Sequence, residues 1–364
     1  MIELAINVEP LETRIAVLEK KTLIELNVER HESRSLVGSI YRGRVDSIVP
    51  GIQAAFIDIG FEKNGFLYVS DIAGAEGTGD FVFEEGTVKP RKGQRRGKAP
   101  SIESMVKKDQ YIMVQVSKDM LGTKGVRLTN YITLPGRYCV LMPTVSHMGV
   151  SRKIESDKER DRLRKLVKQL QPKGMGVILR TAAEGISKSD LEDDLNYIQK
   201  VWQKVLGKME SMKGSGLLHE DLGPVLRTVR DRFSSDVTRV TIDSETEYSR
   251  VLNFLDNFSP ILKKCVKLYR SRRPLFDKLN IEDQITKALQ RTVYLKSGGS
   301  ICIDHTEALV AIDVNTGRFT GSKALEDTVF KTNLEAAEEI ARQVRLRDIG
   351  GIIVVDFIDM QYER

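Results

Sequence analysis

Two aspartates and one asparagine near the C-terminus lie where two apolar stretches of the sequence end. Asp313 and Asn315 belong to the stretch ALVAIDVNT, and Asp356 follows the apolar residues of GGIIVVDFID. Side chains two residues apart on a strand point to the same face, so Asp313 and Asn315 should converge. If the two stretches are neighbouring strands of one sheet, Asp356 lies beside them. The three residues then form a small cluster of oxygen donors.

Oxygen donors without histidine or cysteine suit Mg²⁺ or Mn²⁺ better than Zn²⁺. A carboxylate within an apolar strand also costs free energy unless a partner compensates its charge, and a cation is a common partner. We therefore predict that Asp313 and Asp356 are metal ligands and that Asn315 belongs to the same site. The alternative is that these side chains cap strand ends and face solvent. Three nearby acids are not expected to be direct ligands: Asp304, Glu307 and Asp359.

The elements that must position this cluster follow from the apolar pattern of the last quarter of the chain. The helix should end on its basic residues before Gly350-Gly351, which is a common way to stop a helix. No further helix is predicted to cover the other face of the sheet, so we expect this segment to be incomplete. The predicted order is strands at 291–296, 300–304 and 308–314, a helix at 324–347 and a strand at 351–358.

The first third of the chain has the pattern of short strands. Residues 1–36 alternate between apolar and polar, and residues 37–128 combine Val, Ile, Phe and Tyr with frequent glycine bends, which predicts a small closed barrel. Within it, residues 73–103 are poor in apolar side chains, and residues 89–98 hold six basic residues and no acid. We expect an exposed loop there, which either contacts the phosphates of a polyanionic partner or is merely solvated.

The middle of the chain alternates strands and helices. Strands are predicted at 137–142 and 174–180, on either side of a helix that begins after Ser156. A second helix should run from Ser187 to Met209, because its apolar residues keep helical spacing. Residues 220–290 should form short helices around a strand at 237–242.

Composition narrows the class of protein. With 41% hydrophobic and 30% charged residues, no apolar run long enough for a membrane span and no secretory signal, the chain reads as a cytoplasmic protein. The net charge of +6 permits a polyanionic partner without requiring one. Three separated cysteines, Cys139, Cys265 and Cys302, form no C-x-x-C pair, which argues against a disulfide framework or a zinc site. We expect each to be a buried, unreactive side chain.

Two long segments carry a resemblance to a known family. KSGGSICIDHTEALVAIDVNTGRFTG, which starts at Lys296, and FKTNLEAAEEIARQVRLRDIGGIIVVDFIDM, which ends at Met360, resemble the catalytic segment of the ribonuclease E/G family. The resemblance implies a multidomain fold of α/β and β parts. Its parts would be a split ribonuclease H-like domain (1–36 and 229–290), an inserted OB-type RNA-binding barrel (37–128, with the basic loop 73–103), a 5′-end sensor domain (129–228) and an incomplete deoxyribonuclease I-like catalytic domain (291–364).

The resemblance also implies a chemistry for the carboxylate cluster. Asp313 and Asp356 would bind Mg²⁺, with Mn²⁺ as a substitute, and Asn315 would orient the site. The substrate would be single-stranded RNA, cut to 5′-phosphate and 3′-hydroxyl ends during RNA processing and decay. The family's C-x-x-C zinc-link is absent from this sequence, so we expect no bound zinc and a weakened or absent homo-oligomer. The sequence identifies no degradosome-type protein partner.

A second motif, GVILRTAAEG, matches the 5′-end sensor of that family. It implies that Arg180 and Thr181, with backbone groups around Gly136 and Val140, bind a terminal 5′-monophosphate. A guanidinium fork and a hydroxyl are suitable donors for a phosphate. The alternative is an Arg180 held in an ion pair with a neighbouring acid.

In the predicted barrel, the resemblance assigns RNA contacts to four side chains. Phe56 and Phe66 would stack on bases, and Lys118 and Lys124 would contact the RNA backbone. Phe56 has a simpler alternative as a core residue of the stretch AAFIDIG.

Three functions remain open after this reading of the sequence. The leading one is a metal-dependent endoribonuclease. A non-catalytic RNA-binding protein would use the barrel and sensor residues but not the acids. A metal phosphodiesterase for small substrates would use the acids but not Phe56 and Phe66.

Overall fold

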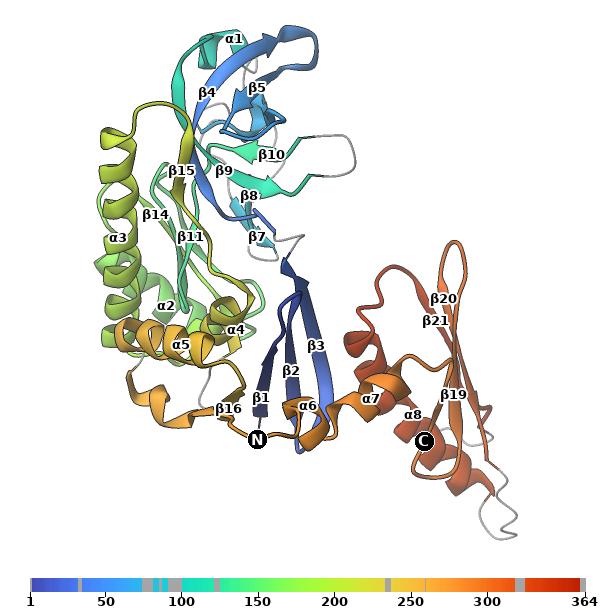
Figure 1. The fold of residues 1–364 in the computed structure, drawn as a ribbon. Coiled ribbons are helices and arrows are strands. Elements are labelled where there is room, and N and C mark those ends of the chain that lie inside the picture. The colour runs from blue at the N-terminus through green and yellow to red at the C-terminus, as the bar shows by residue number, and fades with distance from the viewer. Residues whose placement is uncertain are drawn as a thin grey trace. The chain divides into compact units, whose positions relative to one another are not determined.

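The computed structural model forms two compact units (Figure 1). One unit comprises residues 1–33, 232–255 and 261–364, and the other comprises residues 34–231 and 256–260. Within them the structure describes residues 2–31, 35–73, 81–84, 87–90, 100–120, 125–232, 237–258, 260–317 and 325–360.

A five-stranded mixed sheet in the first unit joins the N-terminal strands to a much later segment. Strand β1 pairs antiparallel with β2 and parallel with β16. Apolar side chains on one face, including Ala16 and Leu18, pack against Leu275 and Phe276 of the short helices that follow the sheet. The strands, in sheet order, are β17 (Val266–Leu268), β16 (Val237–Ile242), β1 (Ile2–Val8), β2 (Glu12–Glu19) and β3 (Thr22–Arg30).

The predicted closed barrel is confirmed in the second unit. Five strands follow one another in the order β4, β5, β6, β10 and β9, and the β4–β9 pairing closes the ring. Glycines occur where the strands crowd: a Cβ on Gly43 would lie 2.4 Å from Ile57, and one on Gly65 would lie 2.5 Å from Leu128. The strands are β4 (Ile40–Val49), β5 (Ala54–Asp58), β6 (Gly65–Tyr68), β9 (Tyr111–Lys118) and β10 (Arg127–Thr129), and β15 (Gly216–His219) pairs with the outside edge of β4.

The prediction of one continuous loop at 73–103 was wrong. Two short strands, β7 (Phe81–Glu84) and β8 (Thr87–Pro90), pair as an antiparallel hairpin within it. The helix α1 (Ile102–Met105) follows, and its Ile102 is fully buried in the barrel core. Strands of four residues such as FVFE and TVKP are too short to show strand periodicity, so the hairpin was not predicted. Most of the basic stretch 89–98 lies outside the described residues.

A four-stranded sheet with two long helices also lies in the second unit, and the two helices predicted there are confirmed. Ser156 accepts a hydrogen bond from the Glu159 N–H and so begins α2, and a capping box of Ser187 and Asp190 begins α3. Both helices pack apolar residues onto the sheet, and Figure 1 shows α3 running along it. The elements are β11 (Leu134–Pro135), β12 (Cys139–Met142), β14 (Gly176–Leu179), β13 (Met148–Val150), α2 (Asp157–Leu170) and α3 (Lys188–Ser211).

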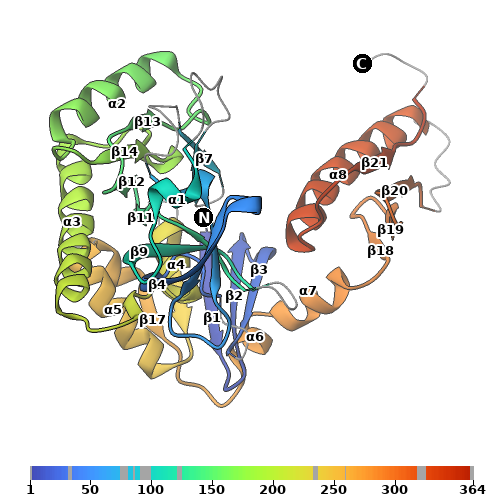
Figure 2. The same ribbon diagram turned by 90° about the horizontal axis from the view of Figure 1, so that it is seen from above.

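The predicted strand–helix–strand arrangement of the last segment is also confirmed. Strands β20 and β21 are parallel neighbours joined by α8. Helix α8 covers one face of the sheet, where its Ala336 and Ile340 pack against Ile301 and Ile312 (Figure 2). The elements, in sheet order, are β18 (Thr292–Tyr294), β19 (Ser300–His305), β20 (Val310–Asn315) and β21 (Ile353–Asp356), with α8 at Leu325–Leu346.

Short helices connect these sheets. None of the helices in the described part of the chain combines the length and the apolar character that crossing a membrane would require. The remaining elements are α4 (Pro224–Arg232), α5 (Glu245–Phe258), α6 (Leu275–Lys278), α7 (Ile281–Ala288) and the 3₁₀ turns η2 (Pro50–Ile52), η3 (Val69–Asp71), η4 (Thr181–Ala183) and η5 (Pro260–Cys265).

Candidate functional site

The carboxylates predicted to bind metal lie side by side. Asp313 of β20 and Asp356 of β21 are directly paired positions of two parallel strands, so both side chains share one face of the sheet. Asn315 lies two residues after Asp313, and its Nδ2 donates a hydrogen bond of 2.7 Å to Asp313 Oδ2. The structure therefore brings together the three residues that the sequence singled out.

Our argument that these acids pay a burial cost was wrong. Asp313, Asn315 and Asp356 are all exposed, because the alternate residues Ile312 and Val314 are the ones that enter the core beneath α8. Exposure agrees with the simpler idea of strand-end caps. Capping alone, however, does not account for two carboxylates on adjacent strands at the same level, where their like charges repel.

The donor set itself fits a hard divalent cation. Two carboxylates and one amide oxygen are ligands that Mg²⁺ accepts, and Mg²⁺ usually keeps several of its waters. The described residues contain no group of three or more His, Cys, Asp or Glu side chains that could hold a metal. A cation bound by Asp313 and Asp356 would therefore take its remaining ligands from water or from substrate.

Glycines fix the chain at the end of β20. Gly298 has a positive φ of 91°. A Cβ on Gly299 would lie 2.8 Å from the Asn315 carbonyl oxygen, and one on Gly317 would lie 2.0 Å from the Gly298 carbonyl oxygen. The turn KSGGS and the end of VNTG thus pack backbone against backbone, which only glycine allows. This contact holds the strand end that carries Asn315.

A buried amide on α8 holds the chain just after Asp356. Asn333 Nδ2 donates to the Ile358 carbonyl at 2.8 Å, and the Ile358 N–H donates to Asn333 Oδ1 at 3.1 Å. Asn333 is only 8% exposed, so this reciprocal pair is shielded from water. Sequence reasoning missed this residue. Its signal was a polar residue on the apolar face of the predicted helix.

The acid nearest to the cluster on the neighbouring strand has a different partner. Asp304 accepts two hydrogen bonds from the Arg291 guanidinium, at 2.5 and 2.6 Å. The hydrogen bond and charge of Arg291 lower the pKa of Asp304. Asp304 is thus engaged in an ion pair with Arg291.

A second polar site surrounds Arg180 at the end of β14. The Arg180 Nη1 donates to the Gly136 carbonyl at 2.8 Å and to Asp231 Oδ1 at 2.5 Å. The Arg180 N–H donates to the Tyr138 carbonyl at 2.8 Å. The structure thus brings Arg180 and Gly136 together, and it contains the ion pair that was our alternative for Arg180.

Thr181 and its neighbours continue this site along η4. The hydroxyl of Thr181 lies 3.0 Å from that of Ser151, and Thr181 is exposed. Beyond η4, the Gly185 N–H donates to Glu159 Oε1 at 2.8 Å. Hydrogen bonds from Arg162 and then from Gly185 lower the pKa of Glu159 to about 2. Glu159 therefore anchors the turn that follows the Arg180–Thr181 pair.

The loop opposite Arg180 is organised by a buried carboxylate. Asp194 of α3 accepts hydrogen bonds from the N–H groups of Arg137, Tyr138 and Cys139, at 3.0, 2.8 and 3.1 Å. A Cβ on Gly136 would lie 2.6 Å from the same carboxylate, so a larger residue there would displace Asp194. Asp194 is 6% exposed. The next strand residue, Val140, is fully buried in β12.

The cysteines only partly follow the prediction. Cys139 is fully buried, and burial followed by the charge of Asp194 raises the pKa of its thiol well above the usual value. Cys265 and Cys302 are partly exposed.

The barrel residues predicted to contact RNA form an aromatic row. The rings of Phe56 and Phe66 meet edge to face with centroids 4.4 Å apart, and Tyr68 lies 5.8 Å from Phe66. All three are half-buried, so Phe56 is not a fully enclosed core residue. Lys118 is exposed at the end of β9, whereas Lys124 lies outside the described residues.

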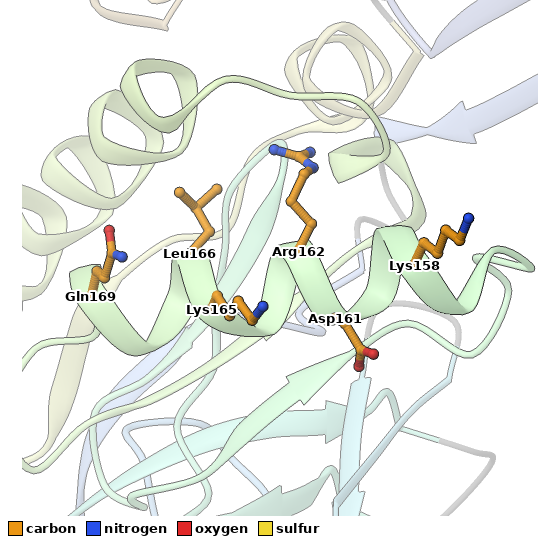
Figure 3. A pocket seen from close by; sticks show the side chains of 6 residues that line it. All are labelled: Lys158, Asp161, Arg162, Lys165, Leu166 and Gln169. Atoms are coloured by element: carbon orange, nitrogen blue, oxygen red, sulfur yellow. The ribbon is translucent and has the colours of Figure 1, made fainter.

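A surface hollow on α2 lies apart from these residues (Figure 3). Its walls come from one helix, and Arg162 within it is held by two hydrogen bonds of 2.7 Å to Glu159. Figure 3 shows Asp161 pointing away from Arg162 and Leu166. The hollow contains none of the predicted functional residues. It is lined by Lys158, Asp161, Arg162, Lys165, Leu166 and Gln169.

Comparison with known proteins identifies the family to which the chain belongs. The model of the ribonuclease E/G family matches residues 133–364. Ribonuclease G of Escherichia coli K12 is 44% identical over 99% of this chain and 72% of its own length. The chain belongs to the ribonuclease E/G family. Ribonuclease G of Haemophilus influenzae is 42% identical, with 99% of this chain and 71% of that protein covered. Ribonuclease E of Nostoc is 42% identical over 90% of this chain and 46% of its length.

The family match includes both polar sites of this ribonuclease E/G family member. The Arg180 site and the carboxylate cluster fall within residues 133–364, and the barrel falls within the alignment to the ribonuclease G proteins. The structure adds three residues that the sequence did not identify: Asn333, Asp194 and Asp231. Each is a polar residue with a distant partner, which spacing along the chain does not reveal.

Proposed function

We propose that this chain is a metal-dependent endoribonuclease that acts on single-stranded RNA in RNA processing and decay. It cleaves to 5′-phosphate and 3′-hydroxyl ends and favours 5′-monophosphorylated substrates. Membership of the ribonuclease E/G family supports the substrate class. The observation that carries the proposal is the pairing of Asp313 with Asp356 on one exposed sheet face, with Asn315 in contact.

Each residue of the cluster has a separate task. Asp313 and Asp356 would hold Mg²⁺, or Mn²⁺ in its place, through their carboxylate oxygens. Asn315 donates to Asp313 and so fixes the orientation of that carboxylate. A bound divalent cation supplies a water of lowered pKa and stabilises the charge that develops on the scissile phosphate. All three side chains are exposed and so are open to a cation from solvent.

We assign the sheets to the parts expected for the family. The five-stranded sheet would be the ribonuclease H-like domain, formed by residues 1–36 and 229–290. The barrel of residues 37–128 would be the OB-type RNA-binding domain, and residues 129–228 would be the 5′-end sensor. The sheet of residues 291–364, with α8, would belong to the deoxyribonuclease I-like catalytic domain.

The preference for a 5′-monophosphate rests on the Arg180 site. Arg180, Thr181 and the backbone at Gly136 are neighbours, and a guanidinium suits a phosphomonoester. The backbone near Val140 completes the pocket in this proposal. The test compares cleavage of one RNA carrying a 5′-monophosphate or a 5′-triphosphate, by the parent and by Arg180→Ala. A parent without preference would remove the sensor from the proposal.

The barrel would bind the single-stranded RNA substrate. Phe56 and Phe66 present half-buried rings for base stacking, which contributes about 1 to 3 kcal/mol per base. Lys118, and Lys124 outside the described residues, would contact phosphates. Replacing both phenylalanines with alanine should weaken RNA binding by roughly a hundredfold, or about 1 to 2 kcal/mol per ring.

The direct test of the whole proposal is RNA cleavage by this chain with and without metal. A 5′-monophosphorylated, AU-rich oligonucleotide should be cut with Mg²⁺, remain intact with a chelator, and yield 5′-phosphate and 3′-hydroxyl ends. Binding without cleavage would favour the non-catalytic RNA-binding protein. Cleavage that ignores RNA length and the loss of Phe56 and Phe66 would favour a phosphodiesterase for small substrates.

A further inference from the structure

The partner of Arg180 is itself held in place by a second arginine. Asp231, on α4, accepts from Arg180 through Oδ1. The same carboxylate accepts two further hydrogen bonds, from Arg230 Nε to Oδ1 and from Arg230 Nη2 to Oδ2, both at 3.0 Å. Arg230 Nη1 also donates to the Pro135 carbonyl at 3.3 Å. The carboxylate is thus clamped between two guanidinium groups.

The three charged side chains are protected from water to different degrees. The side chain of Arg230 is 7% exposed, that of Arg180 18% and that of Asp231 28%. Burial alone would raise the pKa of Asp231, but hydrogen bonds and charge from Arg230, followed by those of Arg180, hold it below the usual value. Asp231 is therefore ionised at neutral pH, and Arg230 is too buried to act as a phosphate ligand itself.

The geometry at Arg180 is set by two fixed acceptors on one nitrogen. Nη1 donates to the carbonyl of Gly136, whose loop is fixed by Asp194, and to Asp231, which is fixed by Arg230. A guanidinium is planar, so two fixed bonds at one nitrogen determine the orientation of the whole group. A long side chain would otherwise lose rotamer entropy on binding a ligand, and this cost is removed in advance.

From this arrangement we infer that Asp231 is a positioning residue for the recognition of a 5′-terminal phosphomonoester by Arg180. The inference rests on the proposed sensor function. Asp231 does not touch the phosphate. It holds the Arg180 guanidinium in a fixed plane, and Arg230 serves to keep the carboxylate ionised and in place.

The experiment measures, for one oligonucleotide, the ratio of kcat/KM with a 5′-monophosphate to kcat/KM with a 5′-triphosphate. Asp231→Asn keeps the side-chain shape but removes the charge, and we expect the ratio to fall about tenfold through a higher KM for the monophosphate. In an Arg180→Ala background, Asp231→Asn should lower the ratio no further, because Asp231 acts through Arg180. Asp161→Asn, which removes an exposed ion pair on α2, is the matched control.

A second variant covers the case in which Asp231→Asn leaves Arg230 buried without a carboxylate and fails to fold. Arg230→Met combined with Asp231→Leu removes the whole pair, an exchange that folds often tolerate. It should lose the preference to the same extent. A general folding defect lowers both rates and leaves the ratio unchanged, so the ratio separates positioning from structure.

The outcomes distinguish this inference from the proposed function. A parent that prefers the monophosphate, with Asp231→Asn or the double variant keeping the parental ratio, overturns the role of Asp231 and leaves the sensor intact. A further loss of ratio in Arg180→Ala/Asp231→Asn also overturns it, because Asp231 would then act independently of Arg180. A parent with no preference overturns the sensor and this inference together.

Discussion

The carboxylate cluster and the Arg180 site are built in opposite ways. Asp313, Asn315 and Asp356 stand exposed on a sheet face, where Asn315 donates a hydrogen bond to Asp313. Arg180 lies in a partly buried network in which Asp231, Arg230 and Asp194 satisfy one another and the loop backbone. The first arrangement leaves negative charge open to a cation and substrate. In the second arrangement, several hydrogen bonds within the protein fix the orientation of one guanidinium.

Because of this difference, substitutions in the two sites should affect the stability of the fold and the rate of cleavage to different degrees. Exposed acids of like charge contribute little to folding. Buried carboxylates that accept several hydrogen bonds contribute to folding and to geometry at once. Substitutions should therefore affect activity alone at the cluster and both properties at the Arg180 site.

Apart from changes to the two aspartates themselves, the largest loss of activity is expected at Asn333, the buried amide that holds the chain after Asp356. Asn333→Leu removes both hydrogen bonds to Ile358 and frees the chain that follows Asp356, so cleavage should fall about 10- to 100-fold. The measurement is the single-turnover rate with Mg²⁺.

Gln343→Leu is the matched control for Asn333→Leu. Gln343 is another buried amide on the same helix, and it is hydrogen-bonded to Glu339 and Arg347 instead of the strand end. If the two variants lose the same activity, general destabilisation of α8 explains the effect and Asn333 does not position the site.

The next prediction compares the free energy of unfolding of two variants, one from each site. Asp194→Asn replaces one of the two acceptor oxygens by an NH₂ group, which opposes one or two of the three backbone N–H donors, and should lower the free energy of unfolding by about 2 to 4 kcal/mol. Asp313→Asn changes an exposed side chain and should stay within about 0.5 kcal/mol of the parent. Urea denaturation measures both. Equal losses in the two variants would contradict the contrast that we draw.

The smallest effect is a pH dependence that belongs to the Arg180 site. Glu159 has a pKa lowered to about 2 against an ordinary value of 4.5, so it stabilises the fold fully above pH 4.5 and loses that contribution as the pH falls towards 2. The difference in melting temperature between the parent and Glu159→Gln should shrink across this window.

Glu192→Gln, an exposed substitution on α3, provides the baseline for the pH experiment. A parent–Glu159→Gln difference that stays constant from pH 5 to pH 3 would show that Glu159 is not held by Arg162 and Gly185.

The sequence predicted most of the elements and the composition of the cluster for a physical reason. Asp313, Asn315 and Asp356 sit on strands whose apolar periodicity is plain, and strand periodicity fixes which residues share a face. It did not predict that this face is the exposed one, because that depends on where α8 packs. The hairpin of β7 and β8 was missed because its strands are too short to show periodicity.

The organisation of the Arg180 site could not be predicted from the sequence, because its members lie far apart along the chain. Arg180 and Asp231 are 51 positions apart, and Asp194 is more than 50 positions from the loop that it holds. An aspartate in a helix carries no mark of the partner that it meets after folding. The ion pair of Arg180 was therefore only one of two alternatives until the fold supplied Asp231 and Arg230.

The central claim is that Asp313 and Asp356 carry out metal-dependent RNA cleavage. The most direct test is the single-turnover cleavage of a 5′-monophosphorylated oligonucleotide with Mg²⁺ by the parent, Asp313→Asn, Asp356→Asn and the control Asp304→Asn, with RNA affinity measured in parallel. We predict a loss of about a thousandfold or more in the first two variants, unchanged RNA affinity, and a control close to the parent. Rates within about tenfold of the parent in both Asp313→Asn and Asp356→Asn would contradict the account.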